Sequence, residues 1–127
     1  MSGICLAAVV LAATLPLSAI TLAWTHSIEK IRCEEDYRIV DRHLVLEEAR
    51  IRGSGAGMEP PADAILKNGV WHYKPVLPPL ERLRLTHYPY TAGYEICSVG
   101  GCIPLTAILT GLPEFALVEV SACRQSP

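Results

Sequence analysis

The stretch AITLAWT, from Ala19 to Thr25, alternates large apolar residues with small or polar ones. Ile20, Leu22 and Trp24 share one parity, and the residues between them share the other. Successive side chains of a β-strand point to opposite faces, so a period of two predicts a half-buried strand. This stretch therefore indicates β-structure.

The same period recurs along the rest of the chain. Residues 37–40 and 44–51 predict a hairpin turning at residues 41–43, and ILKNGVWHY predicts another at Asn68-Gly69. A single helical turn over residues 61–67 is the alternative for the second hairpin. Further strands are expected at residues 82–86, 94–97, 102–105 and 117–121. Many short strands between turns predict an all-β domain, a small antiparallel β-sandwich or barrel-like fold.

The N-terminal part of the chain has a different pattern. GICLAAVVLAATL, from Gly3 to Leu15, is uncharged, and every Lys, Arg, Asp and Glu of the 127 residues lies at or after Glu29. The run has the length of a signal-peptide core and is too short for a membrane span of ~20 residues. No basic residue precedes it and no clear cleavage site follows, so a buried N-terminal element of a cytosolic protein is the alternative. We expect residues 1–19 to be a signal peptide or N-terminal anchor, and residues 20–127 to form one domain.

The charge balance argues against one class of partner. The net charge is −2, with acidic and basic residues mixed along the sequence. Nucleic-acid binding relies on clustered positive charge that contacts phosphates. Nucleic acid is therefore not expected as a partner.

Five cysteines suggest an oxidising compartment. Cys97 and Cys102 flank Gly100-Gly101, so a hairpin there would set them opposite each other, within the range of a disulfide. Zinc is the competing use, but no second pair of ligands has a suitable spacing, and the four histidines are scattered. We expect a disulfide between these two, with no metal site and no cofactor. The pattern leaves Cys33 and Cys123 free or paired.

The polar cluster THSIEK, residues 25–30, follows the first predicted strand. Ser27 beside His26 suggests a hydrolase, but neighbouring strand residues face opposite sides, so His26 is poorly placed to activate Ser27. His26 shares the parity of Trp24 and would also fit as a histidine at the edge of the core. The acidic residues that follow, including Glu35, fit a solvated strand paired with nearby Lys and Arg.

The segment GSGAGM, residues 53–58, superficially resembles a phosphate-binding loop. A dinucleotide fingerprint needs a strand before it and a helix after it, whereas Pro60-Pro61 follows here. Two interpretations stay open, a tight glycine corner and a nest of backbone N–H groups that holds an anion.

Together, WTHSIEK, EEDYR, LVLEEARIRGSGAGMEPP, GVWHYKP, LPPL, the Cys-x4-Cys hairpin and VEVSAC resemble the bacterial domain of unknown function 1850 family, in order from about Ile20 to Cys123. The chain departs from this family at Cys33, where a large aromatic is expected, and that departure hints at a Cys33–Cys123 bond. The distinctive family positions, to which the resemblance assigns no roles, are Thr25, His26, Ser27, Glu29, Lys30, Glu35, Gly53, Gly55, Gly57 and Met58.

The resemblance implies an exported bacterial protein, often encoded beside TAXI-type tripartite transporters that take up carboxylate solutes. We therefore expect a periplasmic, non-enzymatic accessory that contacts the solute receptor or the membrane subunits, and that touches the membrane itself only through an uncleaved N-terminal segment. One alternative is a module that binds a small carboxylate or other anion through the glycine corner and Lys30. A hydrolase using His26 and Glu35 is the other.

Overall fold

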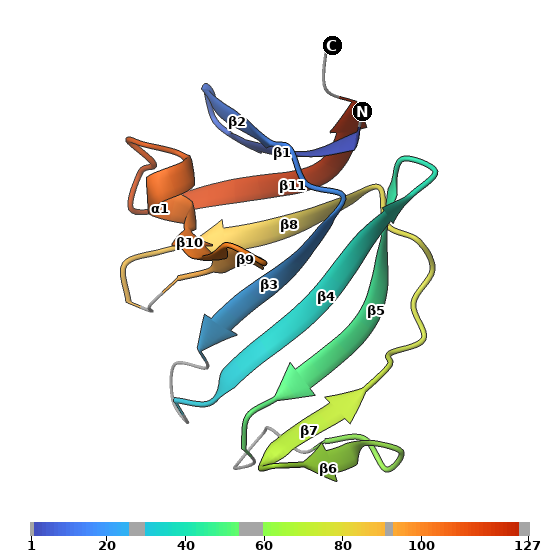
Figure 1. The fold of residues 1–127 in the computed structure, drawn as a ribbon. Coiled ribbons are helices and arrows are strands. Elements are labelled where there is room, and N and C mark those ends of the chain that lie inside the picture. Colours follow the sequence, from blue (N-terminus) through green and yellow to red (C-terminus); the bar gives the residue numbers. More distant parts are fainter. Residues whose placement is uncertain (1, 26–29, 54–59, 91–92, 125–127) are drawn as a thin grey trace.

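The chain folds into two antiparallel sheets that pack face to face (Figure 1). The computed structural model describes residues 2–25, 30–53, 60–90 and 93–124. The smaller sheet has the order β2-β1-β11-β8 and the larger sheet the order β10-β9-β3-β4-β5-β7-β6. This arrangement confirms the predicted all-β antiparallel sandwich. The strands are β1 (Ser2–Ala8), β2 (Leu11–Leu15), β3 (Ala19–Thr25), β4 (Arg32–Val40), β5 (His43–Ile51), β6 (Ile65–Lys67), β7 (Val70–Tyr73), β8 (Arg82–His87), β9 (Glu95–Ser98), β10 (Gly101–Pro104) and β11 (Ala116–Arg124).

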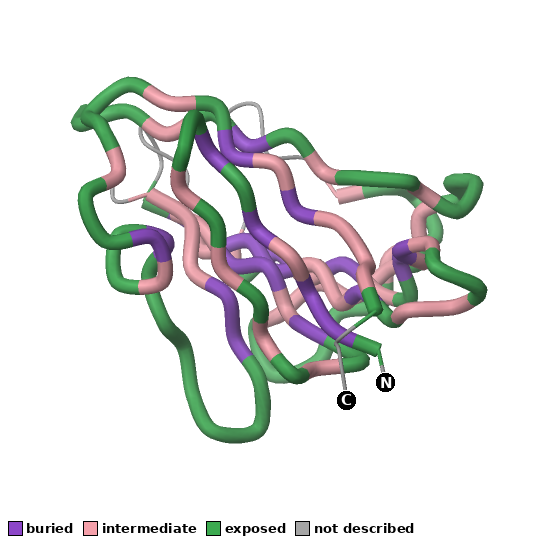
Figure 2. Tube along the Cα trace, turned by 90° about the horizontal axis from the view of Figure 1, so that it is seen from above, coloured by how far each residue is buried: buried purple, intermediate pink, exposed green. Residues whose placement is uncertain are grey.

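The core lies between the two sheets, where the buried residues gather in Figure 2. Each central strand contributes alternate residues, as the period of two predicts. Tyr37 joins this core from β4 and is 4% exposed. The larger aliphatic members that the strands contribute are Ile4, Leu6, Ile20, Leu22, Leu44, Leu46, Leu85, Ile96, Val118 and Val120.

Two hairpins turn where the sequence predicts. Asp41 and Arg42 both have positive φ, 49° and 65°, and join β4 to β5. Asn68 and Gly69, with φ of 52° and 79°, join β6 to β7. Positive φ at both central residues is typical of the tight turn that matches strand twist. The second hairpin excludes the alternative of a helical turn over residues 61–67.

The N-terminal segment is part of the sandwich in this structure. β1 pairs with both β2 and β11, and its Ile4 and Leu6 are almost fully buried. In the described fold, Ser2–Leu15 is therefore a partly buried element of the smaller sheet. Removal of residues 1–19 during export stays a prediction, which the structure does not test.

The disulfides confirm one pairing and correct another. Cys97 and Cys102 are bonded across the β9–β10 hairpin, with Cα atoms 4.0 Å apart. The suggested Cys33–Cys123 bond is wrong, because Cys123 is bonded to Cys5 on the neighbouring strand β1. Cys33 lies in the other sheet and keeps a free, buried thiol.

Helical structure is minimal in the described ranges. One short helix, α1 (Leu105–Ile108), follows β10 and buries Leu105 and Leu109. Across residues 2–25, 30–53, 60–90 and 93–124, no helix has the length and apolar character needed to cross a membrane.

Candidate functional site

The end of the larger sheet carries the described part of the predicted cluster. β3 ends at Thr25 and β4 begins at Arg32, its ladder partner, so residues 30 and 31, the described part of the connection next to β4, lie at this end of the sheet (Figure 1). Lys30, in this connection, is exposed and has φ of 56°. Ile31 beside it is buried. The Lys30 ammonium group therefore extends into solvent from a backbone anchored by its apolar neighbour.

Gly53 lies against this same connection. Arg52 donates its backbone N–H to the Arg32 carbonyl at 3.0 Å, which extends the β4–β5 pairing by one step. A Cβ on Gly53 would lie 3.7 Å from Cγ1 of Ile31, and its φ of 137° disfavours other residues. Ile31, which directly follows the predicted cluster, and Gly53, the first residue of the predicted glycine corner, are thus neighbours. The predicted residues His26, Ser27, Glu29, Gly55, Gly57 and Met58 lie outside the described residues.

An ionic network covers the outer face of the same sheet. Arg50 is only 16% exposed and binds three carboxylates, including both oxygens of Asp36 at 2.7 and 2.6 Å. It also donates to Glu48 at 2.7 Å and to Glu34 at 3.1 Å. The sequence predicted loosely paired, solvated charges. The structure instead brings the charges into a partly buried cluster centred on Arg50, which the sequence analysis missed.

The network holds its carboxylates ionised. Burial alone would raise the pKa of Glu34, but hydrogen bonds from Arg32, Arg50 and Arg52 outweigh burial and bring that pKa below its usual value. The pKa of Asp36 is lowered first by the Arg50 hydrogen bonds, and the Thr21 hydroxyl also donates to it at 2.7 Å. This cluster is satisfied internally, so it stabilises the sheet and offers little unused binding capacity.

Glu35 points the opposite way from Glu34, into the space on the inner face. Its neighbours in the ladder are Leu22 on β3 and Ala49 on β5. The Tyr37 hydroxyl donates to Oε1 of Glu35 at 2.9 Å. Burial raises the pKa of Glu35 despite this hydrogen bond. Glu35 therefore lies on the face of β4 opposite to the Arg50 network.

The family model described as "Domain of unknown function (DUF1850)" matches residues 20–105, more than half of the chain. The chain belongs to the DUF1850 family. The matched region begins in β3 and includes Lys30, Glu35 and Gly53, so the candidate site lies within the family domain. β1, β2 and β11 lie outside the match, yet they form three of the four strands of the smaller sheet. No curated protein and no solved structure matches the chain.

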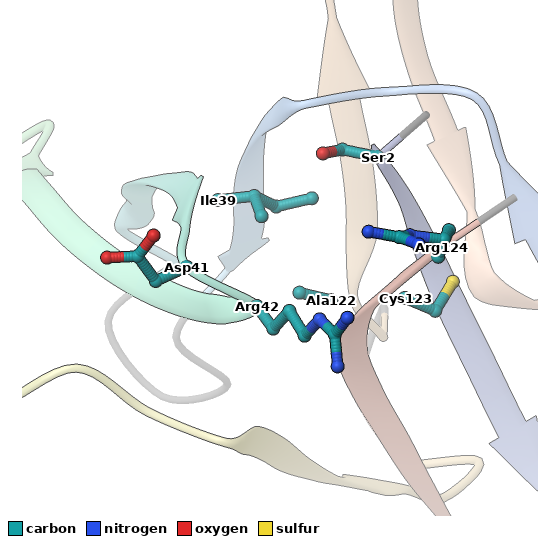
Figure 3. Close-up of a pocket in the computed structure, with 7 residues that line it drawn as sticks. All are labelled: Ser2, Ile39, Asp41, Arg42, Ala122, Cys123 and Arg124. Carbon is teal, nitrogen blue, oxygen red and sulfur yellow. The ribbon is translucent and has the colours of Figure 1, made fainter.

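A cavity of about 330 Å³ lies where the β4–β5 turn meets the start of β1 and the end of β11 (Figure 3). Arg42 and Arg124 reach it from the turn and from β11, and Ser2 lines it as well. The Asp41 carboxylate points away from both guanidinium groups in Figure 3. Among the described residues, neither arginine forms an ion pair. Sequence reasoning missed this pair because Arg42 and Arg124 are far apart in the chain.

Proposed function

We propose that the chain is an exported, non-enzymatic accessory protein of a TAXI-type tripartite carboxylate transporter. Its docking surface is the sheet end at Lys30 and Gly53, which rests on the buried Ile31. The observation that supports this proposal is the proximity of Gly53 to Ile31, the residue that follows the exposed Lys30. A surface of this kind suits recognition of a partner's acidic or carbonyl groups.

The proposed compartment is the periplasm. Two disulfides support an oxidising environment, since such bonds are rare in proteins that remain in the bacterial cytosol. Fractionation followed by intact-mass measurement tests this proposal. A chain that is exported and keeps the described fold should retain Ser2–Leu15, because β1 carries Cys5 and two core residues. A periplasmic product lacking these residues would require a different smaller sheet.

Docking can be tested by copurification with the transporter's own subunits. Lys30→Glu reverses the exposed charge and should abolish capture of the solute receptor or the membrane subunits. Lys74→Glu, at another exposed position, is the matched control and should bind normally. Equal capture by both variants would remove Lys30 from the docking surface, and no capture by the wild-type chain would refute the proposed role.

The cavity at Arg42 and Arg124 favours a second candidate function, binding of a small carboxylate. Two guanidinium groups beside a hydroxyl form a suitable set of donors for a carboxylate. Titration with succinate should show binding that Arg42→Gln and Arg124→Gln each weaken about tenfold, the loss of one charged hydrogen bond. Arg84→Gln, an exposed arginine on β8, is the control. Unchanged affinity in both pocket variants would contradict this assignment.

A further inference from the structure

A narrow cleft opens on the inner face of the larger sheet, near the end of β3. Its volume is about 190 Å³. Two rows of the ladder supply its walls, because residues in register on neighbouring strands share a face. In the first row Cys33 lies between Trp24 and Ile51, and in the second Ala49 lies between Glu35 and Tyr73. All six line the cleft.

Glu34 and Arg50, which pair with each other, also line the cleft, so its lining holds two acidic residues, and Glu35 is the one that no arginine binds among the described residues. Glu35 accepts one hydrogen bond from Tyr37 through Oε1. Within the described part of the chain, no Lys, Arg or His forms an ion pair with Glu35. The nearby arginines at positions 32 and 50 instead bind Glu34, which points to the outer face. The Glu35 carboxylate is therefore not neutralised by any cation among the described residues.

Aromatic rings surround this carboxyl group. Trp24 and Tyr73 line the cleft, and Tyr94 lies against Trp24 with ring centroids 5.7 Å apart. Burial raises the pKa of both Tyr73 and Tyr94, and the charge of Glu35 adds to each increase. Both tyrosines thus lie within electrostatic range of the carboxylate. Aromatic faces carry partial negative charge and attract cations, most strongly where water is excluded.

We propose that this cleft binds a small organic ammonium ion, which pairs with Glu35 and lies against the faces of Trp24 and Tyr73. The volume corresponds to about six water molecules at ~30 Å³ each, which suits a ligand of few heavy atoms. A carboxylate ligand would meet an acid and electron-rich rings. A hard metal ion prefers several oxygen ligands, whereas of the two lining carboxylates Glu34 is already bound by Arg32 and Arg50. This assignment is independent of the proposed docking function.

Calorimetric titration of the full chain with tetramethylammonium chloride tests the proposal, with sodium chloride at the same ionic strength as the reference. We expect saturable binding near pH 8, weakened about tenfold or more by Glu35→Gln, since the buried counter-charge is lost. Glu47→Gln is the matched control, because Glu47 is an exposed acid paired with Arg38. It should bind like the wild type. Equal affinity of E35Q and the wild type, or binding of acetate in place of the ammonium ion, would overturn the proposal.

Cys33 offers a test that needs no substitution. Its free thiol lines the cleft, so an ammonium ion bound there should slow alkylation of Cys33 in the wild-type chain. The protection should saturate at the concentrations seen by calorimetry. An alkylation rate that tetramethylammonium leaves unchanged would place the ligand elsewhere and contradict the proposal, whatever the stability of the variants.

Discussion

Cys5 on β1 and Cys123 on β11 are joined by a disulfide that spans 118 positions of the sequence. The two strands are already neighbours in the smaller sheet, where Gly3 pairs with Cys123 and Cys5 with Ser121. The bond therefore fixes a strand pair whose members enter the fold from opposite ends of the chain. Its contribution is greatest in the unfolded state, where it closes almost the whole chain into a ring.

The two disulfides should differ in what they contribute to stability. The chain-entropy model gives about 4.7 kcal/mol for a loop of ~100 residues and about 2 kcal/mol for a loop of six. The double variant Cys5→Ala/Cys123→Ala should therefore lose about twice as much unfolding free energy as Cys97→Ala/Cys102→Ala. Urea denaturation of both, with the same probe, measures the difference. A larger loss from the hairpin bond would contradict the role given to β1.

Arg50 should be the most sensitive arginine of the outer face. Arg50→Met leaves three carboxylates without their shared partner, and we expect a loss on the order of 2–4 kcal/mol in unfolding free energy. Arg38→Met is the control, because Arg38 makes one exposed pair with Glu47 and should change stability by less than about 1 kcal/mol. Equal effects in thermal unfolding would show that the Arg50 network is solvated.

Acid should remove the contribution of this network. The pKa values of Glu34, Asp36 and Glu48 are all lowered in the folded state, so their stabilisation is complete above the ordinary carboxyl pKa values. It is lost as pH falls through the lowered values. The stability difference between the wild type and Arg50→Met should therefore shrink below about pH 4. A difference that stays constant from pH 7 to pH 3 would argue against this linkage.

Glu35 should show the opposite pH dependence. Its pKa is raised by burial, so the folded state holds the proton more tightly than the unfolded chain. Stability attributable to Glu35 is full below its ordinary pKa and declines as pH rises through the raised value. Glu35→Gln should therefore gain stability relative to the wild type between pH 5 and pH 8, with no such trend in Glu47→Gln. Unfolding curves across this range measure the trend.

The strands and hairpins were predictable because their signals are local. Alternating residues mark β3, β5 and β8, and Asn68-Gly69 marks a turn whatever surrounds it. Cys97 and Cys102 are likewise close in the sequence, so a single hairpin is enough to set them opposite each other. For each of these features, the evidence lies within about ten consecutive residues.

β1 and β2 were obscured by composition. Ile4 and Leu6 do alternate with Cys5 and Ala7, but small apolar residues on both faces give an unbroken run that resembles a signal segment. The Arg50 network depends on register across β4 and β5, including an irregularity between Asp36 and Tyr37. The Glu35 cleft depends on four strands together, β3, β4, β5 and β7. These features arise from long-range pairing, which a single sequence does not specify.

The pairing of β1 with β11 sets Ser2 opposite Arg124, so both ends of the described chain meet at one corner of the smaller sheet (Figure 1). Facing Cα atoms in such a ladder are ~4.5–5.5 Å apart, a gap that a short linker spans. The sandwich is therefore suited to circular permutation, with new ends opened at the exposed Asn68-Gly69 turn. In that permutant the linker would keep β1 and β11 close together in the unfolded chain. Cys5–Cys123 would then close only a short loop, so the disulfide would contribute less to stability.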